Sequence, residues 1–139
     1  MISYTEALSR LMAGASPITE TETVPLLYST GRILAEDVGS PVAVPGWDNS
    51  QMDGYAVRFA EAKEGVVLPV SQRIPAGSVG EALKAGTVAR IFTGAPVPEG
   101  ADAVVPQEET EVTPEGVRFL ASAREGAWIR RRGSDVEQG

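Results

Sequence analysis

The 139-residue sequence contains no cysteine and no histidine. Without cysteine the chain forms no disulfide and has no thiolate nucleophile or thiolate metal ligand. Without histidine it also lacks the usual general base at neutral pH and the commonest zinc ligand. Any chemistry must therefore come from carboxylates, hydroxyls, arginines or backbone groups.

Long apolar runs and lysines are scarce as well. No segment approaches the ~20 apolar residues of a membrane-spanning helix, and the first residues lack the pattern of a secretory signal. We therefore expect a cytoplasmic protein with no membrane partner. Lysine occurs only at Lys63 and Lys84, and neither lies in the Gly-Lys-Ser/Thr context of a P-loop, which excludes a hydrolase of that kind. The net charge of −7 disfavours nucleic acid as a partner.

The residues that are present predict a short helical beginning. The hydrophobic content of 42% is enough to bury a core. The pattern from Ser3 to Glu6 is typical of a capping box, and Leu8, Leu11 and Met12 then share one helical face up to a stop at Gly14. Beyond it, the spacing of apolar residues predicts a second short helix over 26–37.

After residue 46 the pattern changes to short β-branched or aromatic runs, each bounded by glycine or proline, which predict strands. These runs are 55–58, 66–70, 87–92, 103–105 and 117–120, with one further strand over 127–130. The fold class expected is mainly β with an N-terminal helix (α+β), the strands forming a compact antiparallel, barrel-like module. We expect three parts: a helical and extended lead-in over 1–45, the β-module over 46–121, and a truncated return segment over 122–139.

The stretch 45–58 concentrates the polar side chains that are able to form a site. Asp48, Asn49, Ser50 and Asp53 place several hard oxygen ligands close together, which suits Mg²⁺ or Ca²⁺. Their spacing is not that of an EF-hand, and the same side chains are typical of a tight corner that binds its own backbone. Spacing alone favours the corner over the cation site.

Asp53 and Thr93 are two candidates for chemistry. Because Asp53 precedes Gly54, which tolerates unusual backbone conformations, its carboxylate could project from a rigid corner for metal binding or proton handling. From the residues alone, we favour an Asx turn that fixes the corner. Thr93 follows an apolar run, and its hydroxyl and the N–H groups near Gly94 could bind an anion.

Arg130, Arg131 and Arg132 form the one basic run. Three guanidinium groups in sequence could bind a phosphate or carboxylate. A run of this length is more commonly a solvated edge of the molecule, and we prefer that interpretation.

Four segments together resemble one family, MoeA, whose eukaryotic relatives include the gephyrin E domain. They are 31–38 (GRILAEDV), 45–56 (PGWDNSQMDGYA), 90–105 (RIFTGAPVPEGADAVV) and 129–135 (IRRRGSD). The resemblance covers nearly the whole chain, with the four motifs in family order, and it is to the N-terminal region of these proteins. Gln51 and Ser134 depart from the small residue and the glutamate that relatives often carry there.

The resemblance implies a molybdopterin molybdenumtransferase, an enzyme that inserts molybdate into adenylylated molybdopterin and releases AMP with the help of a divalent cation such as Mg²⁺. It implies that Asp53 and Thr93 line the active-site cleft, with Asp53, Thr93 and Gly94 as cofactor-binding residues and Asp53 as the metal ligand. It further implies a homodimer whose cleft is shared between subunits, so that this chain supplies one wall and is inactive alone.

Two other function classes remain open. A scaffold relative would use the same region as a noncatalytic module for dimerisation or partner binding. A generic small β-barrel would bind an anion at Arg130 to Arg132.

Overall fold

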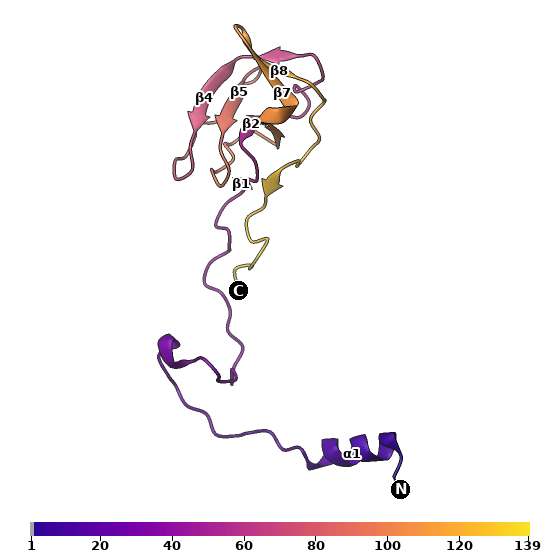
Figure 1. The fold of residues 1–139 in the computed structure, drawn as a ribbon. Coiled ribbons are helices and arrows are strands. Elements are labelled where there is room, and N and C mark those ends of the chain that lie inside the picture. The colour runs from indigo at the N-terminus through magenta and orange to yellow at the C-terminus, as the bar shows by residue number, and fades with distance from the viewer. Residues whose placement is uncertain (1) are drawn as a thin grey trace. The chain divides into compact units, whose positions relative to one another are not determined.

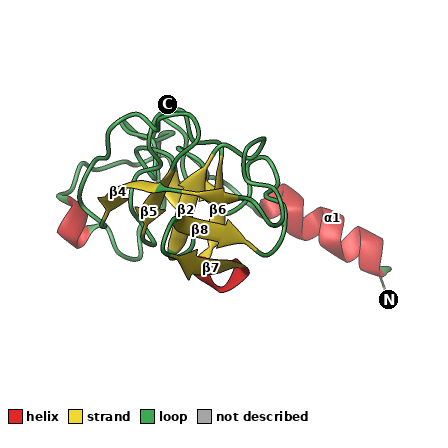
Figure 2. Cartoon of the chain, turned by 90° about the horizontal axis from the view of Figure 1, so that it is seen from above, coloured by secondary structure: helices red, strands yellow, loops and turns green. Residues whose placement is uncertain are grey.

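The structure, a computed structural model, describes residues 2–139. The chain divides into two compact units, Met1–Val38 and Gly39–Gly139. Figure 2 shows the strands in yellow and the helices in red. All strands fall within the second unit, and the long helix falls within the first. The three-part division expected from the sequence, with boundaries at 45/46 and 121/122, stays a prediction.

The first unit begins with the expected helix, α1 (Tyr4–Gly14). The backbone N–H of Glu6 donates to Oγ of Ser3 at 3.2 Å, which caps the helix. The Glu6 carboxylate does not complete a capping box; it accepts a hydrogen bond from Arg10 at 2.7 Å instead. The cap and the end of this helix are therefore confirmed, and the reciprocal half of the box is wrong.

The second predicted helix is also wrong. Only one turn of 3₁₀-helix forms, η1 (Leu26–Tyr28). Three residues later Gly31 adopts a φ of +83°, a left-handed conformation that a helix cannot continue through. The apolar residues beyond it, which share a helical spacing with Leu26 and Leu27, are therefore not on one helix.

No side chain of α1 or η1 is buried. Leu11 is 73% exposed and Leu27 is 89% exposed. The first unit thus has regular secondary structure at its start but contributes no residue to the hydrophobic core. No helix among residues 2–139 combines the length and the apolar character needed to cross a membrane.

The second unit holds nine strands in three sheets (Figure 1). A four-stranded sheet has the order β4 (Val70–Ile74), β5 (Val88–Ile91), β2 (Gly54–Val57), β6 (Ala103–Pro106). A three-stranded sheet has the order β3 (Val67–Leu68), β8 (Gly116–Phe119), β7 (Thr110–Thr113), and β1 (Asn49–Ser50) pairs with β9 (Ile129–Arg130). The mainly β class with an N-terminal helix is confirmed, although the sheets of the described chain do not close into a barrel.

One strand pair departs from the antiparallel expectation. β4 and β5 run parallel, with Arg73 opposite Arg90 and Ile74 opposite Ile91. Parallel neighbours need a crossover of a dozen or so residues, and residues 75–87 supply it without a helix. Sequence patterns do not record strand direction, so a loop of this length was compatible with either arrangement.

The sequence also missed β7. This strand has the exposed, polar pattern of an edge and joins β8 through the turn at Pro114 and Glu115, with Thr113 opposite Gly116. An edge strand that buries no side chain has no alternating apolar signal, which is why it was not recognised.

The core lies on both faces of the four-stranded sheet. Tyr55 and Val57 of β2 face one cluster, together with Val117 and Phe119 of the three-stranded sheet. Ala56 of the same strand faces the other cluster, which extends to Ile129 of β9. Because β2 is buried along its whole length, the loop that leads into it has a rigid support.

Candidate functional site

The corner before β2 brings Asp53 and Thr93 together. The backbone N–H and the hydroxyl of Thr93 both donate to Oδ1 of Asp53, each at 2.8 Å. The two residues lie at the ends of neighbouring strands, β2 and β5, where Gly54 is opposite Ile91. The structure therefore joins the two residues that the sequence singled out separately.

These two hydrogen bonds set the electrostatics of the carboxylate. The Thr93 N–H, followed by the Thr93 hydroxyl, lowers the pKa of Asp53, and the charge of Arg90 lowers it further. Asp53 is therefore ionised at neutral pH. Its second oxygen, Oδ2, accepts no hydrogen bond from the part of the chain that the structure describes, so it is available to a ligand.

Gly54 is needed at this corner for a reason that the sequence did not reveal. Its φ is not positive. A Cβ atom at this position would lie 2.1 Å from the carbonyl oxygen of Val105 on β6, far inside van der Waals contact. The glycine thus allows close approach of β6 to β2, not the unusual backbone conformation that we expected.

The Arg90 side chain stabilises the same corner through two hydrogen bonds. Its guanidinium donates to the carbonyl of Gly54 at 2.9 Å and to Oε1 of Gln107 at 2.7 Å. The backbone N–H of Gln107 in turn donates to the carbonyl of Asp53 at 3.0 Å. The sequence did not indicate a role for Arg90. The pattern that could have done so is a single charged residue inside the buried strand Val88–Ile91.

The loop 48–52 is held to the turn after β5 by backbone hydrogen bonds. The N–H of Ser50 donates to the carbonyl of Ala95 at 2.9 Å, and the N–H of Gly94 donates to the carbonyl of Ser50 at 2.8 Å. The Ser50 hydroxyl donates to the carbonyl of Met52 at 2.6 Å, which is the self-bonded corner that we preferred.

The anion-binding backbone expected at Gly94 is absent from this turn of the described chain. The N–H of Thr93 donates to the Asp53 carboxylate. The N–H of Gly94 donates to the carbonyl of Ser50, and the N–H of Ala95 donates to the carbonyl of Phe92. None of the three is free for an anion. Gly94 allows the tight turn to form, because glycine has no side chain and readily adopts the φ of +81° found here.

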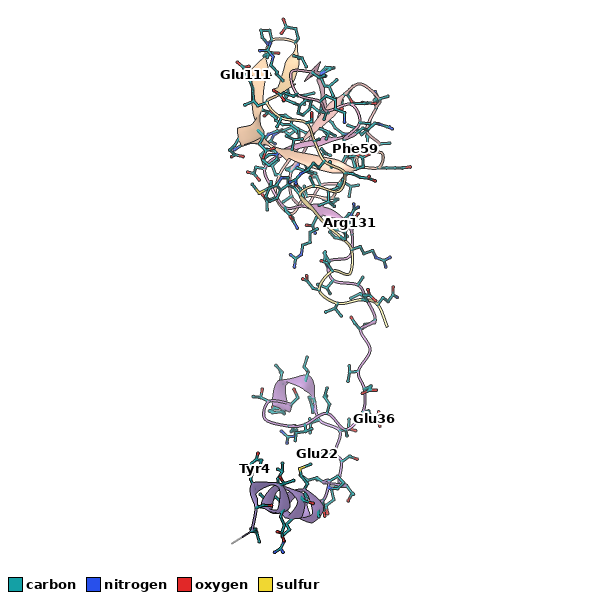
Figure 3. The ribbon with its side chains drawn as sticks, turned by 90° about the vertical axis from the view of Figure 1, so that its right-hand side faces the viewer. Tyr4, Glu22, Glu36, Phe59, Glu111 and Arg131 are labelled. Carbon is teal, nitrogen blue, oxygen red and sulfur yellow. The ribbon has the colours of Figure 1, made fainter. Side chains whose placement is uncertain are left out.

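Asp48 belongs to the frame of the site, but it binds the return segment and not its own loop. Its Oδ1 accepts the backbone N–H of Arg132 at 2.8 Å and its Oδ2 accepts the Arg131 guanidinium at 2.7 Å. Arg131 lies on the segment after β9 (Figure 3). The Arg132 N–H is the main cause that lowers the pKa of Asp48.

The basic run is largely engaged within the molecule. Arg131 pairs with Asp48, and Arg130 forms a salt bridge with Asp135. The Arg132 guanidinium donates to Oε1 of Gln138 at 3.3 Å. These partners weaken the hypothesis of an anion site at Arg130 to Arg132.

An open hollow of about 380 Å³ lies beside the corner. It is lined by residues of the loop 49–51, of the turn after β5 and of β9: Asn49, Ser50, Gln51, Thr93, Gly94 and Arg130. Thr93 thus links the Asp53 carboxylate to a recess large enough for part of a small molecule. The sequence singled out Asn49 and Arg130 separately, as candidate ligands of a cation and of an anion, and it gave Gln51 no binding role.

The four oxygen-bearing residues of the loop do not converge on one cation. Asp48 is bound to the return segment, whereas Asp53 is bound to Thr93. No group of three or more acidic side chains within residues 2–139 is placed to hold a metal ion. Asp53 can offer one free carboxylate oxygen, which suits Mg²⁺ because that ion is usually held by one or two carboxylates together with substrate phosphates.

Comparison with known proteins gives the same family throughout. Residues 2–139 match the family described as MoeA N-terminal region (domain I and II). Molybdopterin molybdenumtransferase 2 of Mycobacterium tuberculosis is 43% identical over 98% of this chain and 34% of its own length. The molybdopterin molybdenumtransferase of Haemophilus influenzae is 38% identical over 100% of this chain and 35% of its own.

The molybdopterin biosynthesis MoeA protein of Pyrococcus horikoshii OT3 has a similar fold, with a TM-score of 0.81 and 34% identity. The match covers 100% of this chain and 38% of that one. The chain therefore spans about a third of the length of these relatives. From the family match and these relatives together, the chain belongs to the MoeA family, as its N-terminal region.

Proposed function

We propose that this chain is part of a molybdopterin molybdenumtransferase, which inserts molybdate into adenylylated molybdopterin with release of AMP. The observation that carries the proposal is the Asp53–Thr93 pair beside the hollow, on a chain of this family. A pterin phosphate and a metal oxyanion are both anionic. An ionised carboxylate repels such ligands. It therefore suits their binding site mainly when a divalent cation binds both the carboxylate and the substrate.

Within this chain, three residues contribute to the proposed site. Thr93 holds Oδ1 of Asp53 and lowers the pKa of the carboxyl group, Arg90 fixes the corner that carries it, and Oδ2 of Asp53 is left for a ligand. Mg²⁺, when bound, would neutralise charge on a phosphate oxygen. Asp53 is its protein ligand in this chain.

We infer that the site is composite and that the full-length protein is a homodimer. The hollow is open to solvent, and the chain spans about a third of its relatives. The uncovered apolar side chains of α1 support the need for a further surface. The isolated chain is then a folded but catalytically silent part of a cytoplasmic enzyme.

The proposal is tested in the full-length protein by following AMP release from adenylylated molybdopterin with molybdate present. Asp53→Asn should lower the rate about tenfold to a hundredfold, as expected for loss of one charged contact. Glu115→Gln is the matched control, because Glu115 is exposed in the β7–β8 turn and also loses one charge. Equal rates for the two variants would contradict the role of Asp53 and favour the noncatalytic partner-binding module.

A further inference from the structure

Arg73 carries a surface guanidinium on the strand next to β5. It lies on β4, directly opposite Arg90 of β5, and the two strands lie side by side (Figure 1). Opposed residues of neighbouring strands share one face of the sheet, so the two arginines are neighbours. Like charges in this arrangement repel each other unless another group compensates for them.

Both arginines lie against the same aromatic ring. The guanidinium carbon of Arg73 is 4.4 Å from the centroid of the Phe92 ring, and that of Arg90 is 4.5 Å from it. Phe92 is half-buried and directly precedes Thr93. The ring therefore holds Arg73 next to the residue that binds Asp53, at a lower entropy cost than a freely rotating arginine would incur.

The two guanidinium groups differ in what they bind. Arg90 is occupied by the Gly54 carbonyl and by Gln107, and its charge acts on Asp53. The Arg73 guanidinium makes no hydrogen bond and no salt bridge with any residue in the range 2–139, and Arg73 is exposed. Its planar fork of N–H donors is thus pre-positioned and unused.

We propose that Arg73, held against the ring of Phe92, the residue before Thr93, is a binding point for a tetrahedral oxyanion. A guanidinium donates two parallel hydrogen bonds to such an anion, a geometry shared by phosphate groups and molybdate. The identity of the natural ligand, a phosphate group or molybdate, rests on the proposed function. The binding of an oxyanion at Arg73 does not rest on it.

Two acidic groups, Asp53 and Glu108, are linked to Arg90, the neighbour of Arg73. The Asp53 carboxylate accepts two hydrogen bonds from Thr93 and interacts with the charge of Arg90, and Glu108 accepts a hydrogen bond from the Gln107 amide at 3.2 Å. Neither forms a salt bridge with Arg73. The oxyanion is therefore recognised by the one guanidinium in this group that no carboxylate or amide engages.

The test is a titration of the 139-residue chain with sodium phosphate, sodium molybdate or AMP in separate arms, at constant ionic strength set with sodium chloride. NMR of the Arg73 side-chain Nε–H and of the Phe92 and Thr93 amides reports binding at the site. We expect saturable shifts in at least one arm. A preference for molybdate identifies the metal oxyanion as the ligand, and a preference for AMP or phosphate identifies a phosphate group.

Three variants make the test specific. Arg73→Gln should weaken binding about tenfold, and Arg73→Lys should fall between it and the parent because it keeps the charge but loses the fork. Arg124→Gln is the control, since Arg124 is also exposed but has no aromatic partner within the described residues. Circular dichroism melting of each variant checks that the fold is kept.

Absence of saturable shifts in all arms, or equal affinity of Arg73→Gln and Arg124→Gln, would overturn the proposal. These results do not depend on catalysis. The proposed function could therefore fail while oxyanion binding at Arg73 stands, or the reverse.

Discussion

The residue at the centre of the candidate site is Asp53, and its orientation and lowered pKa come mainly from Thr93. Two donors from one residue reach a single carboxylate oxygen, so Thr93 holds the orientation and the charge of Asp53 at once. The consequence for chemistry is that the Thr93 hydroxyl is already used as a donor. A substrate anion would have to be bound by other groups, such as Arg73.

The variant Thr93→Val separates the effect of the Thr93 hydroxyl on Asp53 from that of the Thr93 backbone N–H. It removes the hydroxyl and keeps the backbone N–H, which is the larger cause of the low pKa of Asp53. We expect the pKa of Asp53 to rise in the variant but to stay below its ordinary value, as measured by ¹³C NMR of the carboxyl carbon. A pKa unchanged from the parent would show that the hydroxyl does not bind Asp53 in solution.

The sign of the effect on stability follows from that shift. Because the folded state lowers the pKa of Asp53, the stabilising contribution is present above the unfolded pKa of about 3.9 and is lost as the pH falls through the folded value. The parent should therefore lose more stability on acidification than Thr93→Val. Urea unfolding at neutral pH and at acidic pH measures this difference.

At the level of elements, the close approach of β2 and β6 decides where the corner sits. Gly54 lies opposite Pro106, and the carbonyl of Val105 occupies the space of a side chain at Gly54. The same two strands carry both faces of the core. Any change in their spacing would displace Asp53 relative to Thr93.

Gly54→Ala should be strongly destabilising, because backbone atoms of β6 would have to move. We expect a loss of about 3 kcal/mol in the free energy of unfolding, measured by urea denaturation. Gly46→Ala is the control from the same loop, since the nearest atom to a Cβ there is the Ala43 carbonyl oxygen at 4.0 Å. A loss at Gly54 no greater than at Gly46 would contradict the close packing of the two strands.

At the scale of the whole molecule, the hydrophobic core formed by residues 2–139 lies in the second unit. The buried hydrophobic residues run from Ala43 to Ile129, and α1 and η1 bury none. Residues 49–50 and 129–130 close this unit by pairing, and a bridge between Val44 and Val136 continues the contact. The beginning and the end of the second unit are thus joined by pairing between its own residues.

A chain shortened to residues 39–139 should therefore fold by itself. We expect its free energy of unfolding to lie within about 0.5 kcal/mol of that of the 139-residue chain, since the deleted part contributes no core residue. Thermal and urea unfolding of the two chains give the comparison. A markedly less stable shortened chain would mean that the first unit supports the second.

Several features were predictable from the sequence because they depend on neighbouring residues. The cap at Ser3, the end of α1 near Gly14 and most of the buried strands follow from local hydrogen bonding and from apolar spacing. The absence of cysteine and histidine, and the concentration of oxygen side chains at 48–53, were likewise local facts. They directed attention to Asp53.

Other features depended on contacts between distant segments, and only the tertiary structure decided them. The parallel pairing of β4 with β5, the binding of Asp48 to Arg131 and Arg132, and the joining of Asp53 to Thr93 each link residues that no spacing rule connects. Gly54 shows the same limit, because its necessity comes from the Val105 carbonyl on another strand. The sequence by itself determined which residues are able to do chemistry; packing of β2 between β5 and β6 determined which of them meet.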